Sequence, residues 1–73
     1  MAKEIRPVWL LTKRETEVLG LIAEGLGNMA IGARLGISPR TVETHKAHMQ
    51  MKLGLPDAIA LHRYAITKEG ALM

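Results

Sequence analysis

The segment from Ser38 to Gly54 is bracketed by clear helix start and stop signals, and these signals most constrain the fold of the chain. Ser38 is a favourable N-cap residue, because its hydroxyl can accept a hydrogen bond from a free backbone N–H of the first turn. Pro39 follows at the first helical position, where its missing N–H breaks no hydrogen bond. Gly54 stops the segment. We therefore predict a helix over 39–53.

A capping box marks the start of an earlier helix. The Thr12 hydroxyl can accept from the backbone N–H of Glu15, while the Glu15 carboxylate returns a bond to the backbone of Thr12. Gly25 or Gly27 ends this helix. Apolar residues follow the capping box at helical spacing and predict one buried face: Val18, Leu19, Leu21, Ile22 and Leu26.

Two further helices have signals of the same kind. Asn28 is a favourable N-cap for a short second helix that Gly36 ends in a left-handed conformation. Asp57 can cap a fourth helix that runs to about Lys68 and stops at Gly70. Because no strand signal is present, the predicted fold class is all-α, a compact four-helix domain.

Length and composition restrict the chain to a single small domain. It has 73 residues, of which 48% are hydrophobic, so a disordered tail is excluded. It contains no cysteine, hence neither a disulfide framework nor a thiolate metal site. No apolar run approaches the roughly 18 residues of a membrane span, and no signal peptide is visible. We expect a cytoplasmic protein without a membrane partner.

The domain is expected to cover residues 11–73, preceded by an arm or linker stub over 1–10. The first residues contain Pro7 and show no periodicity. Trp9, Leu10 and Leu11 are expected to pack back onto the domain.

The middle of the chain carries the whole excess of positive charge, which is +3 in total. Over 28–54 a single acidic residue, Glu43, faces four cations, whereas the charges on either side cancel. An excess this small is consistent with a solvated surface as well as with a site for a polyanion. The four cations are Arg34, Arg40, Lys46 and Lys52.

The predicted helix over 39–53 has two contrasting faces. At about 100° per residue, Val42, Met49 and Leu53 share a narrow arc that should be buried, with His45 on its flank. The opposite side should be exposed, and it carries Arg40, Glu43, Thr44, Ala47 and Met51.

That exposed side is suited to the major groove of duplex DNA. Thr44 can contact a thymine methyl or donate a bond, Ala47 allows close approach, and Glu43 can accept from a cytosine amino group. Cations at the edges of the helix can hold phosphates. The order of helix, glycine-containing turn and helix, over about 28–47, matches a helix-turn-helix. An ordinary pair of antiparallel helices would have the same packing needs.

Two stretches of the chain resemble the DNA-binding domain of the LuxR family: "LTKRETEVLGLIAEGLGN" and "IGARLGISPRTVETHKAHMQMKLGL". The resemblance covers roughly residues 10 to 72, and the same domain is the output domain of NarL- and FixJ-type response regulators. It implies a bacterial transcriptional regulator that binds double-stranded DNA sequence-specifically, as a dimer, through a recognition helix over about 39–53.

The resemblance also implies roles by position. His45 matches a position that the family fills with histidine, which we interpret as structural, with no metal role. The base-reading positions are Glu43, Thr44 and Ala47. The phosphate-contacting positions are Asn28, Arg40, Thr41, Lys46, His48 and Lys52. A dimer interface on the last helix is assigned to Ala58, His62 and Ala65.

Several residues depart from the family pattern. Met29 replaces a lysine that would contact phosphate, and Gly32 replaces an alanine at a cost of about 1 kcal/mol in helix propensity. Ala58 and His62 stand where arginine and an apolar residue are usual, so the fourth-helix interface differs from that of relatives.

A second hypothesis is a helix-turn-helix module that binds proteins and reads no DNA. Met29 and Met51, if exposed, favour it, since apolar exposure marks protein contacts. RNA polymerase or a receiver or sensor domain would be the partner. The histidines have no neighbouring nucleophile or paired acids, so we predict no enzymatic activity and no cofactor.

Overall fold

The computed structural model describes residues 10–71, and all of its regular elements there are helices. The predicted all-α class is therefore confirmed. None of these helices is long and apolar enough to cross a membrane. The four elements are α1 (Lys13–Ala23), α2 (Asn28–Leu35), α3 (Pro39–Leu53) and α4 (Ala58–Ala71).

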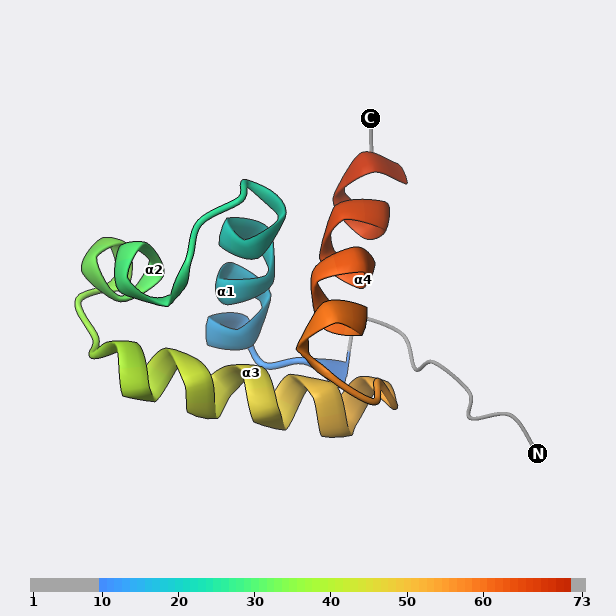
Figure 1. Ribbon diagram of the computed structural model, residues 1–73, viewed down its shortest axis with the longest axis horizontal. Coiled ribbons are helices and arrows are strands. Elements are labelled where there is room, and N and C mark those ends of the chain that lie inside the picture. Colours follow the sequence, from blue (N-terminus) through green and yellow to red (C-terminus); the bar gives the residue numbers. More distant parts are fainter. Residues whose placement is uncertain (1–9, 72–73) are drawn as a thin grey trace.

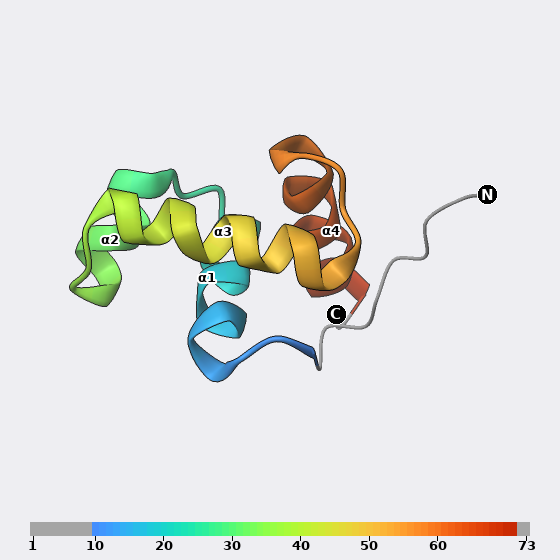
Figure 2. The same ribbon diagram turned by 90° about the horizontal axis from the view of Figure 1, so that it is seen from below.

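The longest helix, α3, lies along one side of the molecule. The other three helices all lie on the same side of α3 (Figure 1). Viewed from below, α3 crosses in front of α1, α2 and α4 (Figure 2). One long side of α3 is thus covered by the rest of the fold, while no other helix within residues 10–71 covers the opposite side.

An aliphatic core joins the four helices. The stripe predicted for α3 is confirmed, because Val42, Met49 and Leu53 are completely buried. Leu26 lies beyond the end of α1 and only packs against the edge of this core. The other fully or nearly fully buried apolar side chains are Leu11, Val18, Leu19, Leu21, Ile22, Ile31, Leu55, Leu61, Tyr64 and Ala65.

The helix starts follow the predicted capping pattern in three cases out of four. The backbone N–H of Glu15 donates to the Thr12 hydroxyl at 3.1 Å, and that of Thr12 donates to the Glu15 carboxylate at 2.9 Å. The Ser38 hydroxyl accepts from the backbone N–H of Thr41 at 3.1 Å. Asp57 accepts from the Ala60 N–H at 2.8 Å, which caps α4.

The start of α2 and the end of α4 differ from the prediction. Asn28 already has its place inside α2, and Gly27 is the N-cap residue without any side-chain bond. A residue inside the first turn cannot act as the extended N-cap, because that role needs a non-helical backbone. α4 passes through Gly70 and ends at Ala71, since a glycine only weakens a helix and need not end it.

At the amino end, Leu11 is buried as expected, whereas Leu10 is 42% exposed. The arm over 1–10, including Trp9, lies almost wholly outside the described residues.

Gly32 permits a close approach in the turn between α2 and α3. Its carbonyl accepts a hydrogen bond from the Ile37 N–H at 2.9 Å, and a Cβ atom at Gly32 would lie 2.5 Å from the Ile37 carbonyl oxygen. Such a contact is too short for a real side chain. Gly36 completes the turn with a φ of 72°, in the left-handed region that favours glycine. The glycine at 32 therefore has a packing reason that offsets its low helix propensity.

Candidate nucleic-acid interface

The uncovered side of α3 carries a continuous row of exposed residues, which we call the outward face: Arg40, Thr44, Ala47 and Met51. Their spacing of four, three and four residues places them above one another along the helix. Glu43 is exposed beside this row, as the sequence predicted. The side chains assigned to base reading are thus brought together on one accessible surface.

The hydroxyl of Thr44 already has a partner inside the helix. Its Oγ1 donates to the carbonyl oxygen of Arg40 at 3.2 Å. The hydroxyl proton is therefore used within α3, which leaves the Thr44 methyl group and the oxygen lone pairs for an external contact. Of the two contacts predicted for Thr44, this geometry favours the apolar one.

The amino-terminal end of the outward face and its flanks carry polar and basic groups. Arg40, Thr41 and His48 are exposed, and Lys46 is half-buried. Burial lowers the pKa of Lys46, and the neighbouring Glu43 carboxylate partly offsets this effect. A phosphate beside the Lys46 ammonium would raise the pKa of Lys46, as Glu43 does, because an anion favours the charged form of the amine.

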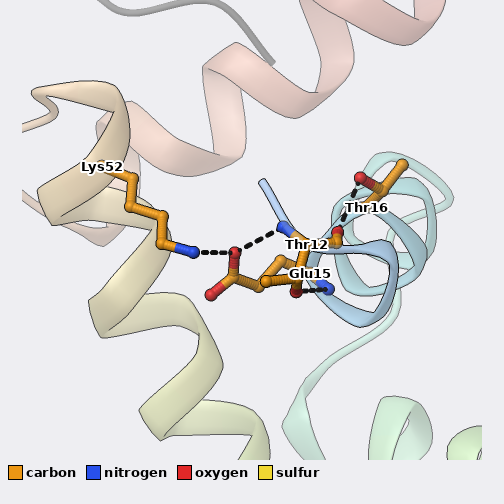
Figure 3. Close-up of polar contacts among 4 residues, drawn as sticks. All are labelled: Thr12, Glu15, Thr16 and Lys52. Atoms are coloured by element: carbon orange, nitrogen blue, oxygen red, sulfur yellow. Dashed lines mark hydrogen bonds and ion pairs between the residues drawn. The ribbon is translucent and has the colours of Figure 1, made fainter. Parts of the chain in front are cut away.

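Lys52 is bound to α1 (Figure 3). Its Nζ lies 2.7 Å from Oε1 of Glu15, the same oxygen that accepts from the Thr12 backbone N–H. Glu15 is only 3% exposed. Its carboxylate therefore joins the start of α1 to the last turn of α3, and Lys52 is held on the covered side of α3.

This pair could not be predicted from local sequence patterns, because its two residues are 37 positions apart. Glu15 was explained by the capping box alone, and Lys52 by its charge. The only signal in the sequence was that Lys52 falls near the edge of the buried stripe on the helical wheel.

The environment of Glu15 affects its ionisation in two opposite ways. Burial by itself raises the pKa of a carboxyl group, but the hydrogen bonds from Lys52 and from the Thr12 backbone, together with the Lys52 charge, outweigh it. The pKa of Glu15 consequently lies below its ordinary value of 4.5. The group is a carboxylate at neutral pH and completes an ion pair.

Asn28, assigned to a phosphate contact, stands at the first position of α2. Its Oδ1 is buried and has no hydrogen-bond partner among the residues that the structure describes. Because a carbonyl oxygen cannot bind a phosphate oxygen, only the amide nitrogen of this side chain could serve in that role.

The residues assigned to a dimer interface are not all accessible. Ala58 and His62 are exposed on α4, but Ala65 is fully buried in the core. The assignment of Ala65 was wrong, because a side chain without accessible surface cannot touch a partner. Two exposed apolar residues that the sequence analysis did not single out lie on the same helix: Ile59, 68% exposed, and Ile66, 49% exposed.

His45 is half-buried on α3. Among the side chains that the structure describes, residues 10–67, no three histidine, aspartate or glutamate groups gather as metal ligands would.

Comparison with known proteins identifies the family of this chain. Residues 10–65 match the family described as bacterial regulatory proteins, luxR family. The chain is also 48% identical over 63 residues to the oxygen regulatory protein NreC of Staphylococcus aureus, strains JH9 and Mu3. That similarity covers 86% of this chain and 29% of each relative, so the chain spans less than a third of their length. The chain belongs to the luxR family of bacterial regulatory proteins.

Proposed function

We propose that this helix-turn-helix domain of a transcriptional regulator binds double-stranded DNA with α3 in the major groove and α2 across the sugar-phosphate backbone. The observation that carries the proposal is the outward face of α3, which is exposed along its length and flanked by Lys46 and His48. An α-helix fits the major groove, and short side chains at its centre allow it to approach the bases closely.

The residues divide into two groups by the contacts they would make. Glu43, Thr44 and Ala47 face the base edges, with Glu43 accepting from a cytosine amino group and Thr44 packing its methyl group on a thymine. The positioning contacts to phosphates come from Asn28, Arg40, Thr41, Lys46 and His48. Lys52 leaves that group in our proposal, because its ammonium is bound to Glu15.

We propose that two copies bind two half-sites through α4. The exposed side chains of that helix include Ala58, Ile59, His62 and Ile66, and apolar exposure of this kind is typical of contact surfaces. The domain covers residues 11–73, with residues 1–10 as an arm. RNA polymerase and a receiver or sensor domain are the protein partners that we propose for the whole regulator.

Selection of bound duplexes from a random pool tests the base-reading assignment. With Glu43→Gln we expect the preferred base at one position to change from cytosine to adenine, because glutamine pairs bidentately with adenine. The difference in binding free energy between cytosine and adenine at this position should change by about 1–3 kcal/mol. Glu17→Gln is the matched control, since Glu17 is exposed on α1 and away from the outward face.

A positioning residue should behave differently in the same selection. Arg40→Ala should weaken binding to all duplexes about equally and leave the selected sequence unchanged, because phosphates carry no base information. If Glu43→Gln and Arg40→Ala gave the same uniform loss, the division between reading and positioning residues would be wrong.

A further inference from the structure

Met51 is the one long apolar side chain of the outward face. It is 77% exposed and lies one turn beyond Ala47, in line with Arg40 and Thr44. The core does not use it, because the buried stripe of α3 lies on the opposite side and consists of Val42, Met49 and Leu53. Met51 is therefore available for a contact outside the chain, and its place in line with the base-reading residues Thr44 and Ala47 indicates where that contact would be made.

Met51 lies at the carboxyl-terminal end of the proposed reading surface, one turn from Ala47. Helical side chains lean toward the amino end of their helix, so Met51 covers the turn that holds Ala47. The methyl group of Ala47 leaves room there for a long, unbranched neighbour. The row from Arg40 to Met51 spans about 16 Å along the helix, at 1.5 Å per residue. Met51 therefore lies at one end of the row, and its side chain leans toward the residues assigned to base reading.

The chemistry of the groove restricts what a methionine can contact there. Its thioether donates no hydrogen bond and accepts only weakly, so it gains nothing from a phosphate and would desolvate it. The base edges of the major groove offer hydrogen-bonding groups and one exposed apolar group, the C5-methyl of thymine. We propose that Met51 is a specificity-determining residue that packs on the C5-methyl group of a thymine at the outer edge of the half-site. This inference rests on the proposed function.

Replacing single thymines by deoxyuridine tests the contact directly, because uracil pairs with adenine in the same way but lacks the methyl group. The starting duplex is the one selected from a random pool by the 73-residue chain. Each thymine of its half-site is replaced in turn, and the affinity of each duplex is measured by fluorescence anisotropy. The measurement is repeated with Met51→Ala and with Met29→Ala, a matched control because Met29 is 79% exposed but belongs to α2.

At one thymine on the edge of the half-site, the original chain and Met29→Ala should lose about fourfold in affinity on replacement by deoxyuridine, the value of one buried methyl group. Met51→Ala should bind the duplex with thymine and the duplex with deoxyuridine at that position equally. Circular dichroism should show unchanged helix content, since alanine is the better helix former.

The inference is overturned if no thymine shows this loss of discrimination in Met51→Ala, or if the selected half-site contains no thymine at all. Either result leaves the proposed function intact when the chain still selects a sequence. A chain that selects no sequence and binds no duplex overturns the proposed function, and the inference with it.

Discussion

Glu15 is the one buried charged side chain of residues 10–67, and its role exceeds that of a helix cap. Its carboxylate accepts from Thr12 at the start of α1 and from Lys52 in the last turn of α3. A buried carboxylate is stable only when its partners replace the lost water, and these two donors do so. The pair therefore fixes the position of α3 relative to the rest of the fold.

Lys52→Met should separate this structural role from a phosphate contact. The change keeps the length of the side chain but leaves Glu15 buried without its cation. We expect the free energy of unfolding, measured by urea denaturation, to fall by about 1–2 kcal/mol, less than for a fully buried pair because Lys52 is partly solvated. Lys13→Met, at an exposed position of α1, should change it by less than about 0.5 kcal/mol.

Lys52→Met should also leave the salt dependence of DNA binding unchanged. Each cation that neutralises a phosphate contributes about 0.9 to the slope of log affinity on log salt. Lys46→Met should reduce the magnitude of the slope by about that amount, whereas Lys52→Met should not. A reduction of equal size in Lys52→Met would return Lys52 to the phosphate-contacting group.

Stability should also depend on pH through Glu15. Because its pKa is lowered on folding, its contribution is complete above the pKa of the unfolded chain and is lost as pH falls through the folded pKa. We expect the urea midpoint to decrease from pH 5 downward. Glu15→Gln keeps the capping box, since glutamine can return the same bond, and should flatten this decrease. An equally flat profile in Glu17→Gln would assign the effect to surface charge in general.

At the scale of the elements, helix ends were the most predictable feature. The starts of α1, α3 and α4 and the ends of α2 and α3 depend on residues within a few positions, such as Ser38, Gly36 and Gly54, so the sequence alone identifies them. The outward and buried sides of α3 follow from helical periodicity in the same way.

Contacts between elements were not predictable from the sequence. The Glu15–Lys52 pair and the burial of Ala65 depend on how the helices pack against one another, and no local pattern encodes that packing. Helix propensity alone predicts that Gly32 is unfavourable in α2. The close approach of the Ile37 carbonyl oxygen, which leaves no room for a Cβ atom, explains the glycine.

Two glycines should therefore respond oppositely to alanine. Gly20 lies in α1, and a Cβ atom there meets nothing within 4 Å, so Gly20→Ala should raise the free energy of unfolding by about 0.5–1 kcal/mol. Gly32→Ala should lower it by about 1–2 kcal/mol, because the turn must move away from α2. Urea denaturation measures both. Stabilisation by Gly32→Ala would show that the turn relaxes at little cost.

At the scale of the whole molecule, the fold separates two surfaces. α3 lies along one side of the molecule, and α4 extends away from it on the side where α1 and α2 also lie (Figure 1). The exposed residues of the outward face belong to the side of α3 that these helices leave uncovered. One surface is thus available to DNA, and the other to the second copy that we propose. This separation predicts that DNA binding and the association of two copies can be changed independently.

Ile59→Gln combined with Ile66→Gln tests that independence. We expect binding to a duplex with two half-sites to weaken by about tenfold, or about 1.4 kcal/mol, because the apolar contact between copies is lost. Binding to a duplex with one half-site should not change, which serves as the internal control. A uniform loss on both duplexes, measured by anisotropy, would argue against an interface on α4.

Amide chemical shifts, followed while the protein is titrated with a duplex at low salt, show whether the outward face of α3 enters the major groove. We predict that the largest changes occur in α3, at Arg40, Thr44, Ala47 and Met51, while amides of α4 beyond Leu61 stay in place on a single half-site. Binding that moves the α4 amides and leaves those of α3 unchanged would contradict the account. So would a domain whose amides do not respond to DNA at all, as expected for a module that binds only proteins.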